Sequence, residues 1–319
     1  MKRIGVLTSG GDSPGMNAAI RAVVRTALYR GIKVAGILRG YTGLIHDEII
    51  NMDHRSVSNI IGHGGTMLKT SRCPEFQTKE GRARAAEVVS KNEIDGLVII
   101  GGNGSYAGAD IFMQEHKIPC IGLPGTIDND LEGTDFTIGS DTALNTALDA
   151  VDKIRDTLTS LERIFIVEVM GRSSGYIALN VALAGGAEQV VIPERTFDIQ
   201  EMCHAITEGY IRGKASWLII VAEGAIRGQD LAKKIAETTD LDTRLVVLGH
   251  IQRGGAPTAK DRILATCLGT AAVELLHKGE GGVAVGLKGN KVNTVPFKEA
   301  FETKPIQTQA LHALIKILI

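Results

Sequence analysis

The stretch "GVLTSGGDSPGMNAAI", Gly5–Ile20, decides the fold, because a glycine-bearing turn joins an apolar run to a helical pattern. The run Ile4–Leu7 is short and apolar on both faces, as a buried parallel strand must be. From Met16 onward, apolar residues recur at helical spacing, and Gly31 ends the pattern. The stretch therefore predicts a strand–loop–helix unit, the building block of an α/β protein.

The same succession of elements recurs along the chain. A second strand–turn–helix pattern, "FIVEVMGRSSGYIALN", spans Phe165–Asn180, and a long amphipathic helix is expected to begin at Ser140. We expect an α/β fold of two Rossmann-like, doubly wound, three-layer domains with mainly parallel sheets. The predicted strands are Ile4–Leu7, Lys33–Leu38, Gly96–Ile100, Cys120–Leu123, Ile164–Val169, Gln189–Ile192, Trp217–Ala222 and Leu245–Leu248.

Composition narrows the class of protein. The 319 residues include 35 Lys and Arg and 36 Asp and Glu, so no global charge favours nucleic acid or an anionic membrane. The four cysteines are far apart and form no C-x-x-C pair, which argues against zinc and for a reducing compartment. The apolar runs are too short for a signal peptide or a membrane span, so we expect a cytoplasmic protein.

Glycines and carboxylates follow three of the predicted strands. The turns are "TSGGDSPGMN" at Thr8–Asn17, "GGNGSY" at 101–106 and "LPGTIDNDLEGTD" at Leu123–Asp135. Glycine loops before a helix leave backbone N–H groups for a phosphate, and the Asp128/Asp130 pair suits Mg²⁺ and a general base. Alone, the first turn is explained equally well as a tight structural turn, and the aspartate pair is better explained as an Asx-rich surface turn. Together they favour a nucleotide-phosphate site.

Three further strand ends carry charged residues beside glycine: "VMGRSSG", "VAEG" and "LGHIQRGG". Arginine and histidine in such places can bind a second phosphate, although each is singly more often a surface charge. Two phosphate sites flanking a carboxylate predict phosphoryl transfer from a nucleotide to a phosphorylated acceptor.

The segments "TSGGDSPGMNAAIR", "TSRCPEF", "PGTIDND", "IGSDTALNT", "DKIRDT", "EVMGR", "VAEG" and "VLGHIQRGG" resemble those of the bacterial ATP-dependent 6-phosphofructokinases, the phosphofructokinase A family. The resemblance runs from Met1 to about Gly286. It implies a glycolytic phosphotransferase that moves the γ-phosphoryl of Mg-ATP to the 1-hydroxyl of fructose 6-phosphate, giving fructose 1,6-bisphosphate and ADP. It also implies an allosteric homotetramer. An ATP-binding domain is expected over 1–139 plus about 257–304, and a fructose 6-phosphate-binding domain over 140–256 plus about 305–319.

The resemblance assigns roles residue by residue. Asp128 resembles the base that takes the sugar hydroxyl proton. The groups implied to stabilise the transferring phosphoryl are Arg72, Arg172, Thr126 and Gly11. The sugar phosphate is implied to contact Thr126, Asp128, Asp130, Met170, Gly171, Arg172, Glu223, His250 and Arg253, with Arg163 and Arg244 reaching in from the neighbouring subunit. The implied ATP contacts are Gly11, Tyr41, Arg72, Cys73, Arg82, Gly102, Asn103, Gly104, Ser105 and Gly108; Asn103 and Asp130 are the implied Mg²⁺ ligands.

Two glycines are implied to select the phosphoryl donor. Relatives that use pyrophosphate carry a bulky charged residue at the position of Gly104 and a lysine at that of Gly125. A side chain at the first position would fill the space that the α-phosphate of ATP needs. Glycine at both positions therefore implies ATP.

An effector pocket for ADP and phosphoenolpyruvate is also implied by the resemblance. Arg21 and Arg25 lie one helical turn apart, and such arginines are usually only solvated. His54 and Asn59 depart from the arginine and aspartate common in relatives, so we expect altered effector affinity, with a pH-sensitive response through His54. The implied effector residues are Arg21, Arg25, His54, Arg55, Asn59, Arg155, Glu188, Arg212 and Lys214.

Asn103 raises an alternative. The family pattern reads G-G-D-G-S here, and its aspartate helps to hold Mg²⁺, which prefers carboxylates. We expect an active kinase with weakened metal binding. The alternative is a non-catalytic nucleotide and sugar-phosphate sensor, or a regulatory paralogue, and an engineered substitution is a third explanation. Retention of Asp128, Arg72 and Arg172 favours the enzyme.

Overall fold

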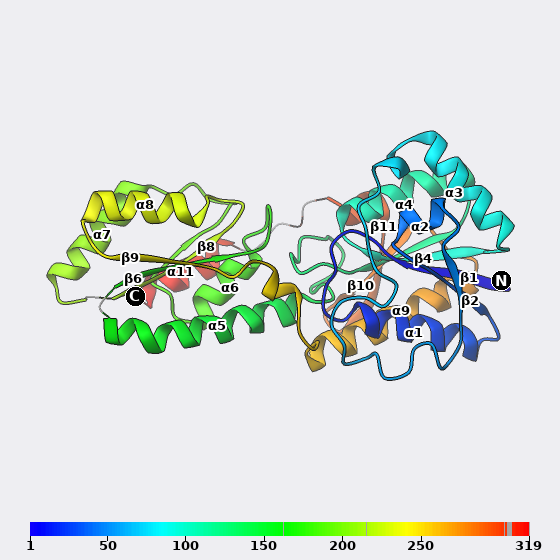
Figure 1. The fold of residues 1–319 in the computed structure, drawn as a ribbon, viewed down its shortest axis with the longest axis horizontal. Helices are drawn as coiled ribbons and strands as arrows, with labels where there is room; N and C mark the ends of the chain where they lie inside the picture. The colour runs from blue at the N-terminus through cyan, green and yellow to red at the C-terminus, as the bar shows by residue number, and fades with distance from the viewer. Residues whose placement is uncertain (162, 215, 303, 305–307, 319) are drawn as a thin grey trace. The chain divides into compact units, whose positions relative to one another are not determined.

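The computed structural model describes residues 1–161, 163–214, 216–302, 304 and 308–318. The chain forms two compact units (Figure 1): Met1–Thr142 with Arg253–Lys304, and Ala143–Gln252 with the described part of Pro305–Ile319. The expected domain ranges differ from these units by a few residues at each crossing.

Unit 1 is built on a seven-stranded sheet in the order β11-β10-β5-β4-β1-β2-β3. The sheet is parallel except at its edges, where β3 and β11 pair antiparallel with β2 and β10. Its strands are β1 (Arg3–Thr8), β2 (Lys33–Ile37), β3 (Ile49–Met52), β4 (Gly96–Gly101), β5 (Cys120–Pro124), β10 (Val283–Lys288) and β11 (Lys291–Pro296). Its helices are α1 (Met16–Tyr29), α2 (Tyr41–Ile45), η1 (Pro74–Gln77), α3 (Lys79–Lys91), α4 (Asn103–His116), α9 (Ala259–His277) and α10 (Phe297–Ala300).

Helices cover both faces of this sheet because its central strands are apolar on both sides. Ile4 and Val6 point into a core shared with α1 and α9, while Leu7 points into a second core shared with α2, α3 and α4. Figure 1 shows these two helical layers on opposite sides of the sheet. Alternation with a period of two along each strand fills both cores.

Unit 2 has a smaller parallel sheet in the order β7-β8-β6-β9. Helices α7 and α8 cover one face, and α5 and α6 cover the other, with α11 packed beside α6 (Figure 1). The strands are β6 (Ile164–Val169), β7 (Gln189–Val191), β8 (Trp217–Ala222) and β9 (Thr243–Val247). The helices are α5 (Ser140–Leu161, in this unit from Ala143), α6 (Tyr176–Ala184), α7 (Ile199–Ile211), α8 (Gly228–Thr239) and α11 (Thr308–Ile317), and η2 (Gly249–Arg253) follows β9.

The α/β class and the mainly parallel sheets predicted from the sequence are confirmed. All eight predicted strands are present, although β9 begins at Thr243 rather than Leu245. Strands β3, β10 and β11 were not predicted. Across the described residues, no helix combines the length and the hydrophobicity that a membrane span requires.

Candidate active site

The winding of the unit 1 sheet reverses between β1 and β4, because β2 lies on the far side of β1 and β5 on the far side of β4. Ligands of open α/β sheets bind beyond the carboxyl ends of the strands at such a point. The loops after both strands meet there: the Ser9 amide donates to the Ile100 carbonyl at 2.9 Å. A side chain at Gly101 would come within 2.6 Å of the Ser9 carbonyl oxygen, so only glycine permits this approach. The two predicted glycine loops, at Thr8–Asn17 and 101–106, thus lie side by side and form one surface, the glycine floor.

The N-terminus of α4 opens onto this floor. Its first turn begins at Asn103, directly after Gly102, and leaves backbone N–H groups without helical partners, as an anion site requires. Tyr41 braces the turn from below: its hydroxyl donates to the Ser105 carbonyl at 2.6 Å, and its ring stacks on Phe76 at 3.8 Å. Tyr41 is 5% exposed, so it mainly supports the loop.

The two glycines implied to select the donor sit in different surroundings. A Cβ placed on Gly104 would meet no atom within 4 Å, so the space beside this residue is open. A Cβ on Gly125 would lie 2.9 Å from both Ile100 Cγ2 and Met16 Cε. Gly125 is therefore also required by packing, whereas no atom of the described residues requires glycine at position 104.

Asn103 and Asp130 are brought together from two different strand ends. The Asn103 Nδ2 donates to Asp130 Oδ2 at 2.7 Å. This hydrogen bond fixes the orientation of the amide, because the reverse orientation would place two oxygens against each other. The Asn103 Oδ1 is then buried without a hydrogen-bond partner among the described residues. A buried oxygen acceptor without a donor is suited to a cation.

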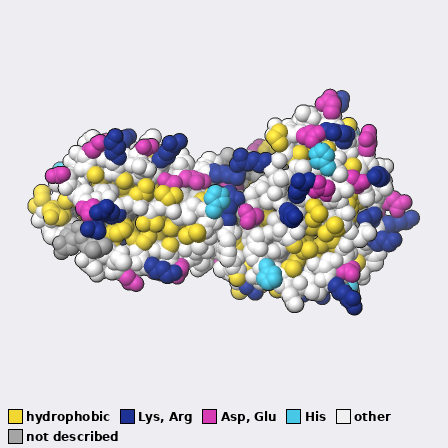
Figure 2. Space-filling view, in the orientation of Figure 1, with side chains coloured by type: hydrophobic (Ala, Val, Ile, Leu, Met, Phe, Trp, Pro, Cys, Tyr) yellow, Lys and Arg dark blue, Asp and Glu magenta, His cyan; other side chains and the backbone are white. Residues whose placement is uncertain are grey.

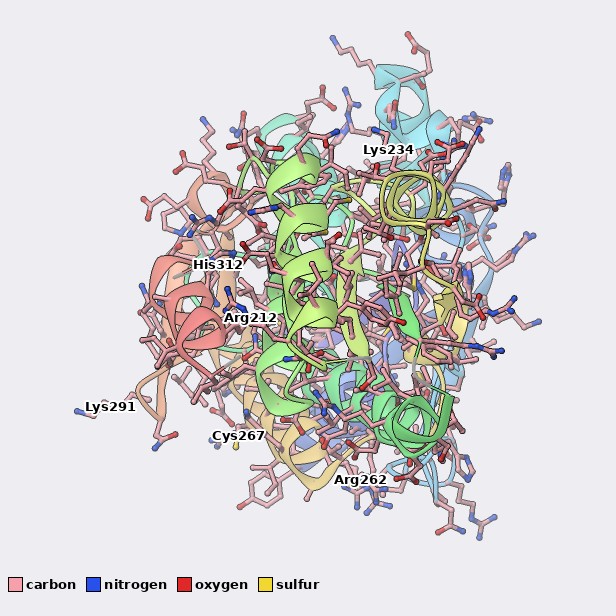
Figure 3. All side chains as sticks on the ribbon, turned by 90° about the vertical axis from the view of Figure 1, so that its left-hand side faces the viewer. Arg212, Lys234, Arg262, Cys267, Lys291 and His312 are labelled. Atoms are coloured by element: carbon pink, nitrogen blue, oxygen red, sulfur yellow. The ribbon has the colours of Figure 1, made fainter. Side chains whose placement is uncertain are left out.

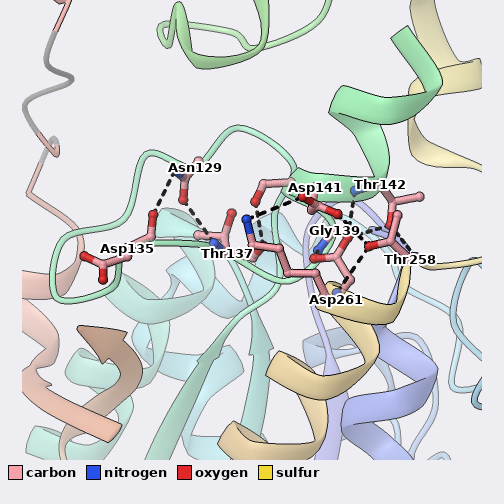
Figure 4. Close-up of polar contacts among 10 residues, drawn as sticks. Asn129, Asp135, Thr137, Gly139, Asp141, Thr142, Thr258 and Asp261 are labelled. Atoms are coloured by element: carbon pink, nitrogen blue, oxygen red, sulfur yellow. Dashed lines mark hydrogen bonds and ion pairs between the residues drawn. The ribbon is translucent and has the colours of Figure 1, made fainter. Parts of the chain in front are cut away.

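Asp128 is 4% exposed and lies in the loop after β5. Its amide donates to Thr126 Oγ1 at 3.2 Å. The loop is braced by Asn129, whose side chain accepts from the Thr137 amide at 3.0 Å and donates to the Asp135 carbonyl at 3.2 Å (Figure 4). Asn129 was not predicted to have a role, although its place between the two aspartates was a signal.

The other unit 1 residues implied for ATP differ in exposure. Arg72 is exposed and Cys73 is half-buried. Arg82 is buried, and its guanidinium donates to both carboxylate oxygens of Glu115 and to the carbonyls of Phe76 and Gln77. These hydrogen bonds give Arg82 a structural role, and its contact with a nucleotide stays a prediction.

Gly108 packs against the stacked rings of Tyr41 and Phe76. A Cβ added at Gly108 would lie 3.3 Å from each ring.

Arg253 lies in unit 1 over the first glycine loop. Its Nη1 is 3.5 Å from the Asp12 carbonyl oxygen and 3.9 Å from Asp12 Oδ1. The guanidinium occupies the space beside Gly11 that a side chain at this position would need. An arginine implied for a sugar phosphate is thus held beside a glycine implied for phosphoryl transfer.

Unit 2 assembles its own group at the carboxyl ends of β6 and β8. The Arg172 amide donates to Glu223 Oε1 at 3.1 Å, and Arg172 adopts a positive φ of 51°. Its carbonyl presses against Gly224, where an added Cβ would collide with it. A cavity of about 570 Å³ opens here, lined by Glu168, Arg172, Glu223, Gly224, Arg227, Gln229, Leu245 and Val247.

Gln252 supports this edge of unit 2 and was not predicted. It is fully buried, accepts from the Met170 amide at 3.4 Å and donates to the Gly249 carbonyl at 3.1 Å. Gly171, beside Met170, has a φ of 145°, and His250 is exposed. Gln252 stands between the predicted His250 and Arg253, so its place in "HIQR" was the only available signal.

Arg163 and Arg244 lie at the amino-terminal ends of the strands of the same sheet, opposite the carboxyl ends that carry Glu223. Arg163 directly precedes β6, and Arg244 is near the start of β9, whereas Met170 and His250 follow the ends of these strands. Arg244 pairs with Phe165, so five residues at about 3.3 Å each separate its level from that of Met170 by roughly 16 Å, and Arg163 lies two residues farther away. Within unit 2, these arginines therefore do not join the group that contains Glu223.

The implied effector residues divide between the units. In unit 2, Glu188 pairs with Lys214 at 3.4 Å and with Arg155 at 3.9 Å. Arg212 instead pairs with Glu208 at 3.0 Å, at the end of α7 (Figure 3). The unit 1 members on α1 and in the 54–59 loop are Arg21, Arg25, His54, Arg55 and Asn59, of which the last three are exposed.

Several known proteins are similar to this chain over its whole length. The family model described as Phosphofructokinase matches residues 3–276. The chain is 56% identical over 318 residues to the ATP-dependent 6-phosphofructokinase of Bacillus subtilis strain 168, covering all of this chain and 99% of that protein. It is 52% identical over 319 residues to the protein of the same name from a Thermoanaerobacter species, with the same coverage.

Solved structures give the same result. The phosphofructokinase of Saccharomyces cerevisiae is similar over all of this chain and 47% of that chain, with a TM-score of 0.89 and 36% identity. A pyrophosphate-dependent phosphofructokinase from Marinobacter aquaeolei matches over all of this chain and 92% of that one, with a TM-score of 0.85 and 25% identity. With full-length matches in both sequence and fold, the chain belongs to the phosphofructokinase family.

Proposed function

We propose that this chain is an ATP-dependent 6-phosphofructokinase, which transfers the γ-phosphoryl of ATP to the 1-hydroxyl of fructose 6-phosphate. The observation that carries the proposal is identity above half over the whole chain with relatives of that name. Gly104 supports ATP over pyrophosphate, because the space beside it is open. The more distant pyrophosphate-dependent structure shares only a quarter of its residues with this chain.

The two units divide the substrates. Unit 1 binds ATP at the glycine floor and the N-terminus of α4, where backbone N–H groups and the helix dipole favour phosphate. Unit 2 binds the sugar with Met170, Gly171 and Glu223. The Arg172 amide on Glu223 supports this assignment, because it fixes the carboxylate that would accept sugar hydroxyl protons in hydrogen bonds.

Asp128 acts as the general base. As the sugar oxygen attacks the γ-phosphorus, its proton passes to the Asp128 carboxylate, and the bond from the γ-phosphorus to the leaving ADP oxygen breaks. Arg72, Arg172, Thr126 and the Gly11 amide offset the charge on the transferring phosphoryl. The burial of Asp128 supports its role as the base. Exclusion of water from this carboxylate keeps water from competing with the sugar hydroxyl as acceptor of the phosphoryl group.

The residues present fit a Mg²⁺ ion held jointly with ATP. No group of three or more His, Cys, Asp or Glu that could hold a metal occurs in the described part of the chain. Mg²⁺ commonly needs only one or two protein oxygens when phosphates and waters complete its shell. Asp130 and the buried Asn103 Oδ1 would supply these oxygens. The ion would neutralise phosphate charge during transfer.

The proposal includes a homotetramer in which Arg163 and Arg244 serve the neighbouring subunit. Their place at the opposite ends of the strands from Glu223 supports this. The outermost strand β9 also supports it, because Val247 on this strand is 55% exposed. Figure 2 shows hydrophobic side chains along this side of unit 2. ADP and phosphoenolpyruvate are the proposed effectors. Glu188 and its ion-pair partners Lys214 and Arg155 form part of the proposed pocket.

The deciding experiment measures fructose 1,6-bisphosphate made by the purified chain at saturating Mg²⁺, with ATP and with pyrophosphate in parallel. We expect turnover with ATP only. Turnover with pyrophosphate alone would overturn the choice of donor. Absence of turnover with both, while ATP and fructose 6-phosphate still bind, would favour the regulatory paralogue that Asn103 raises.

A further inference from the structure

One carboxylate contacts both Arg163 and Arg244 at the amino-terminal ends of the unit 2 strands. Asp242 Oδ2 lies 2.6 Å from Arg163 Nε, and Asp242 Oδ1 lies 3.1 Å from Arg244 Nε. The Arg244 Nη2 also donates to Asp242 Oδ2 at 3.2 Å. Each oxygen of Asp242 is therefore engaged, and the two guanidinium groups converge on it from adjacent strands.

The backbone fixes the place of this carboxylate. Asp242 directly precedes β9, and its carbonyl accepts the Ile164 amide at 3.0 Å, which begins the pairing of β6 with β9. Arg163 and Asp242 are thus neighbours because of strand register, whatever the rotamers of their side chains. Strand register alone places an acid beside Arg163 and two residues before Arg244, on the same face of the sheet.

An acid in this place changes what the arginines can do. Two guanidinium groups side by side repel each other, and each long side chain has many rotamers. A shared carboxylate offsets the repulsion and orders both. Each guanidinium has five N–H donors in a planar fork, more than one carboxylate can accept. The ordered pair can therefore present donors to a second anion.

We propose that Asp242 is a positioning residue, which holds Arg163 and Arg244 as a preformed fork for the phosphate of fructose 6-phosphate bound by a neighbouring copy of this chain. The inference rests on the proposed function and adds a residue to it. Asp242 does not touch the reacting atoms and acts only through the two arginines.

An opposing effect must be weighed, since the carboxylate also repels the incoming phosphate. The Arg163, Asp242 and Arg244 side chains are 33%, 45% and 55% exposed, so water screens this repulsion. The ordering of two arginines is not screened in this way. Loss of Asp242 is therefore expected to weaken binding of the sugar phosphate.

The test compares Asp242→Asn, Asp242→Ala and Asp242→Glu with the wild type in steady-state kinetics. We expect the KM for fructose 6-phosphate to rise at least about fivefold in the Asn and Ala variants, with kcat within about twofold, because binding rather than chemistry depends on the fork. The Glu variant should return most of the affinity, because it restores the charge. Mass measurement in solution confirms that the oligomer is retained.

Asp240→Asn is the matched control. It removes the same charge two residues away, no ion pair of Asp240 occurs within the described residues, and asparagine tolerates the φ of 56° at this position. An unchanged or lowered KM in Asp242→Asn, or an equal rise in Asp240→Asn, would overturn the inference. Failure of the proposed function is distinct, because the wild type would then make no fructose 1,6-bisphosphate.

Discussion

At the scale of single residues, Asn103 changes the balance between the metal-free and metal-bound site. Its amide donates to the Asp130 carboxylate at 2.7 Å. An aspartate in its place would put two carboxylates at this distance, and like charges so close repel strongly unless a cation lies between them. Asparagine therefore stabilises the empty site and removes one charge that would attract Mg²⁺.

The first prediction concerns Asn103→Asp. Without Mg²⁺ the variant should melt at a lower temperature than the wild type, because a hydrogen bond becomes a like-charge pair. With Mg-ATP it should gain more stability than the wild type, and the Mg²⁺ concentration for half-maximal rate should fall about tenfold, which corresponds to about 1.4 kcal/mol. Thermal melting with and without Mg²⁺ provides a measurement independent of activity.

Asn103→Ala serves as the control for this prediction, since it removes the hydrogen bond without adding charge. It should melt at a lower temperature with and without Mg²⁺ alike. A Mg²⁺ requirement that stays the same in Asn103→Asp would refute the proposed weakening of the metal site.

The second prediction concerns Gly104. An aspartate here enters open space and stands in the first turn of α4, where negative charge suits the helix dipole by about 0.3–1 kcal/mol. We expect Gly104→Asp to melt no lower than the wild type while kcat/KM for ATP falls at least tenfold, or about 1.4 kcal/mol. Gly104→Ala, which adds one methyl group in the same space, should keep most of the activity. Equal ATP use by Gly104→Asp would exclude donor selection at this position.

At the scale of elements, the start of α5 is capped by a residue from α9 rather than by its own neighbours. Asp261 is 1% exposed and accepts from the Gly139 amide at 2.9 Å and from the Thr142 amide at 2.8 Å (Figure 4). Thr258 adds hydrogen bonds of its own to Asp141 and Thr142. Because these residues are far apart in sequence, the cap ties two distant segments of unit 1 together.

The third prediction is that Asp261→Ala destabilises the protein by about 2–3 kcal/mol, because buried N–H groups lose their acceptor. Burial raises the pKa of Asp261 above its ordinary value of 3.8, although the hydrogen bonds from Thr142 and Gly139 oppose this. With the folded pKa raised, the native state binds more protons, so this group's contribution to stability falls as pH rises through the two pKa values. Urea unfolding from about pH 3.5 to 7 should show the wild type losing stability relative to Asp261→Asn, which does not titrate. A constant difference between the two would contradict the sign.

These elements also show what sequence could predict. Buried parallel strands such as β4 were predicted because their apolar runs are continuous. The antiparallel edge strands β3 and β11 were missed because their exposed residues interrupt that pattern. The glycine loops and Asp128 were predicted because they follow buried strands. Asp242 and Asp261 were missed because their roles depend on partners that only the folded chain brings near.

At the scale of the whole molecule, the two edges of the unit 2 sheet carry different parts of the proposed sugar-phosphate site. Glu223 follows the end of β8, whereas Arg163 and Arg244 lie at the starts of β6 and β9. The rise along the strands places Arg244 roughly 16 Å from the level of Glu223 in one copy, and Arg163 farther still. Two copies related by a two-fold axis can each supply the arginines to the other copy's glutamate. Such an interface presents the strand starts of each copy to the strand ends of its partner.

The fourth prediction follows from this exchange. Glu223→Gln and Arg244→Ala should each be nearly inactive at low fructose 6-phosphate, yet mixed oligomers should recover activity. In a mixed pair, one site takes its glutamate from the Arg244→Ala chain and its arginines from the Glu223→Gln chain, and is therefore intact. Random pairing gives about half mixed pairs with one intact site in two, so about a quarter of wild-type activity should return in the unseparated mixture and about half in the isolated mixed pairs. Co-expression with two affinity tags isolates the mixed species, and mixing Arg163→Ala with Arg244→Ala is the matched control, since both lack the same half of the site and should stay inactive. Mixed oligomers of Glu223→Gln and Arg244→Ala that remain inactive would place both groups in one subunit's site and refute the exchange.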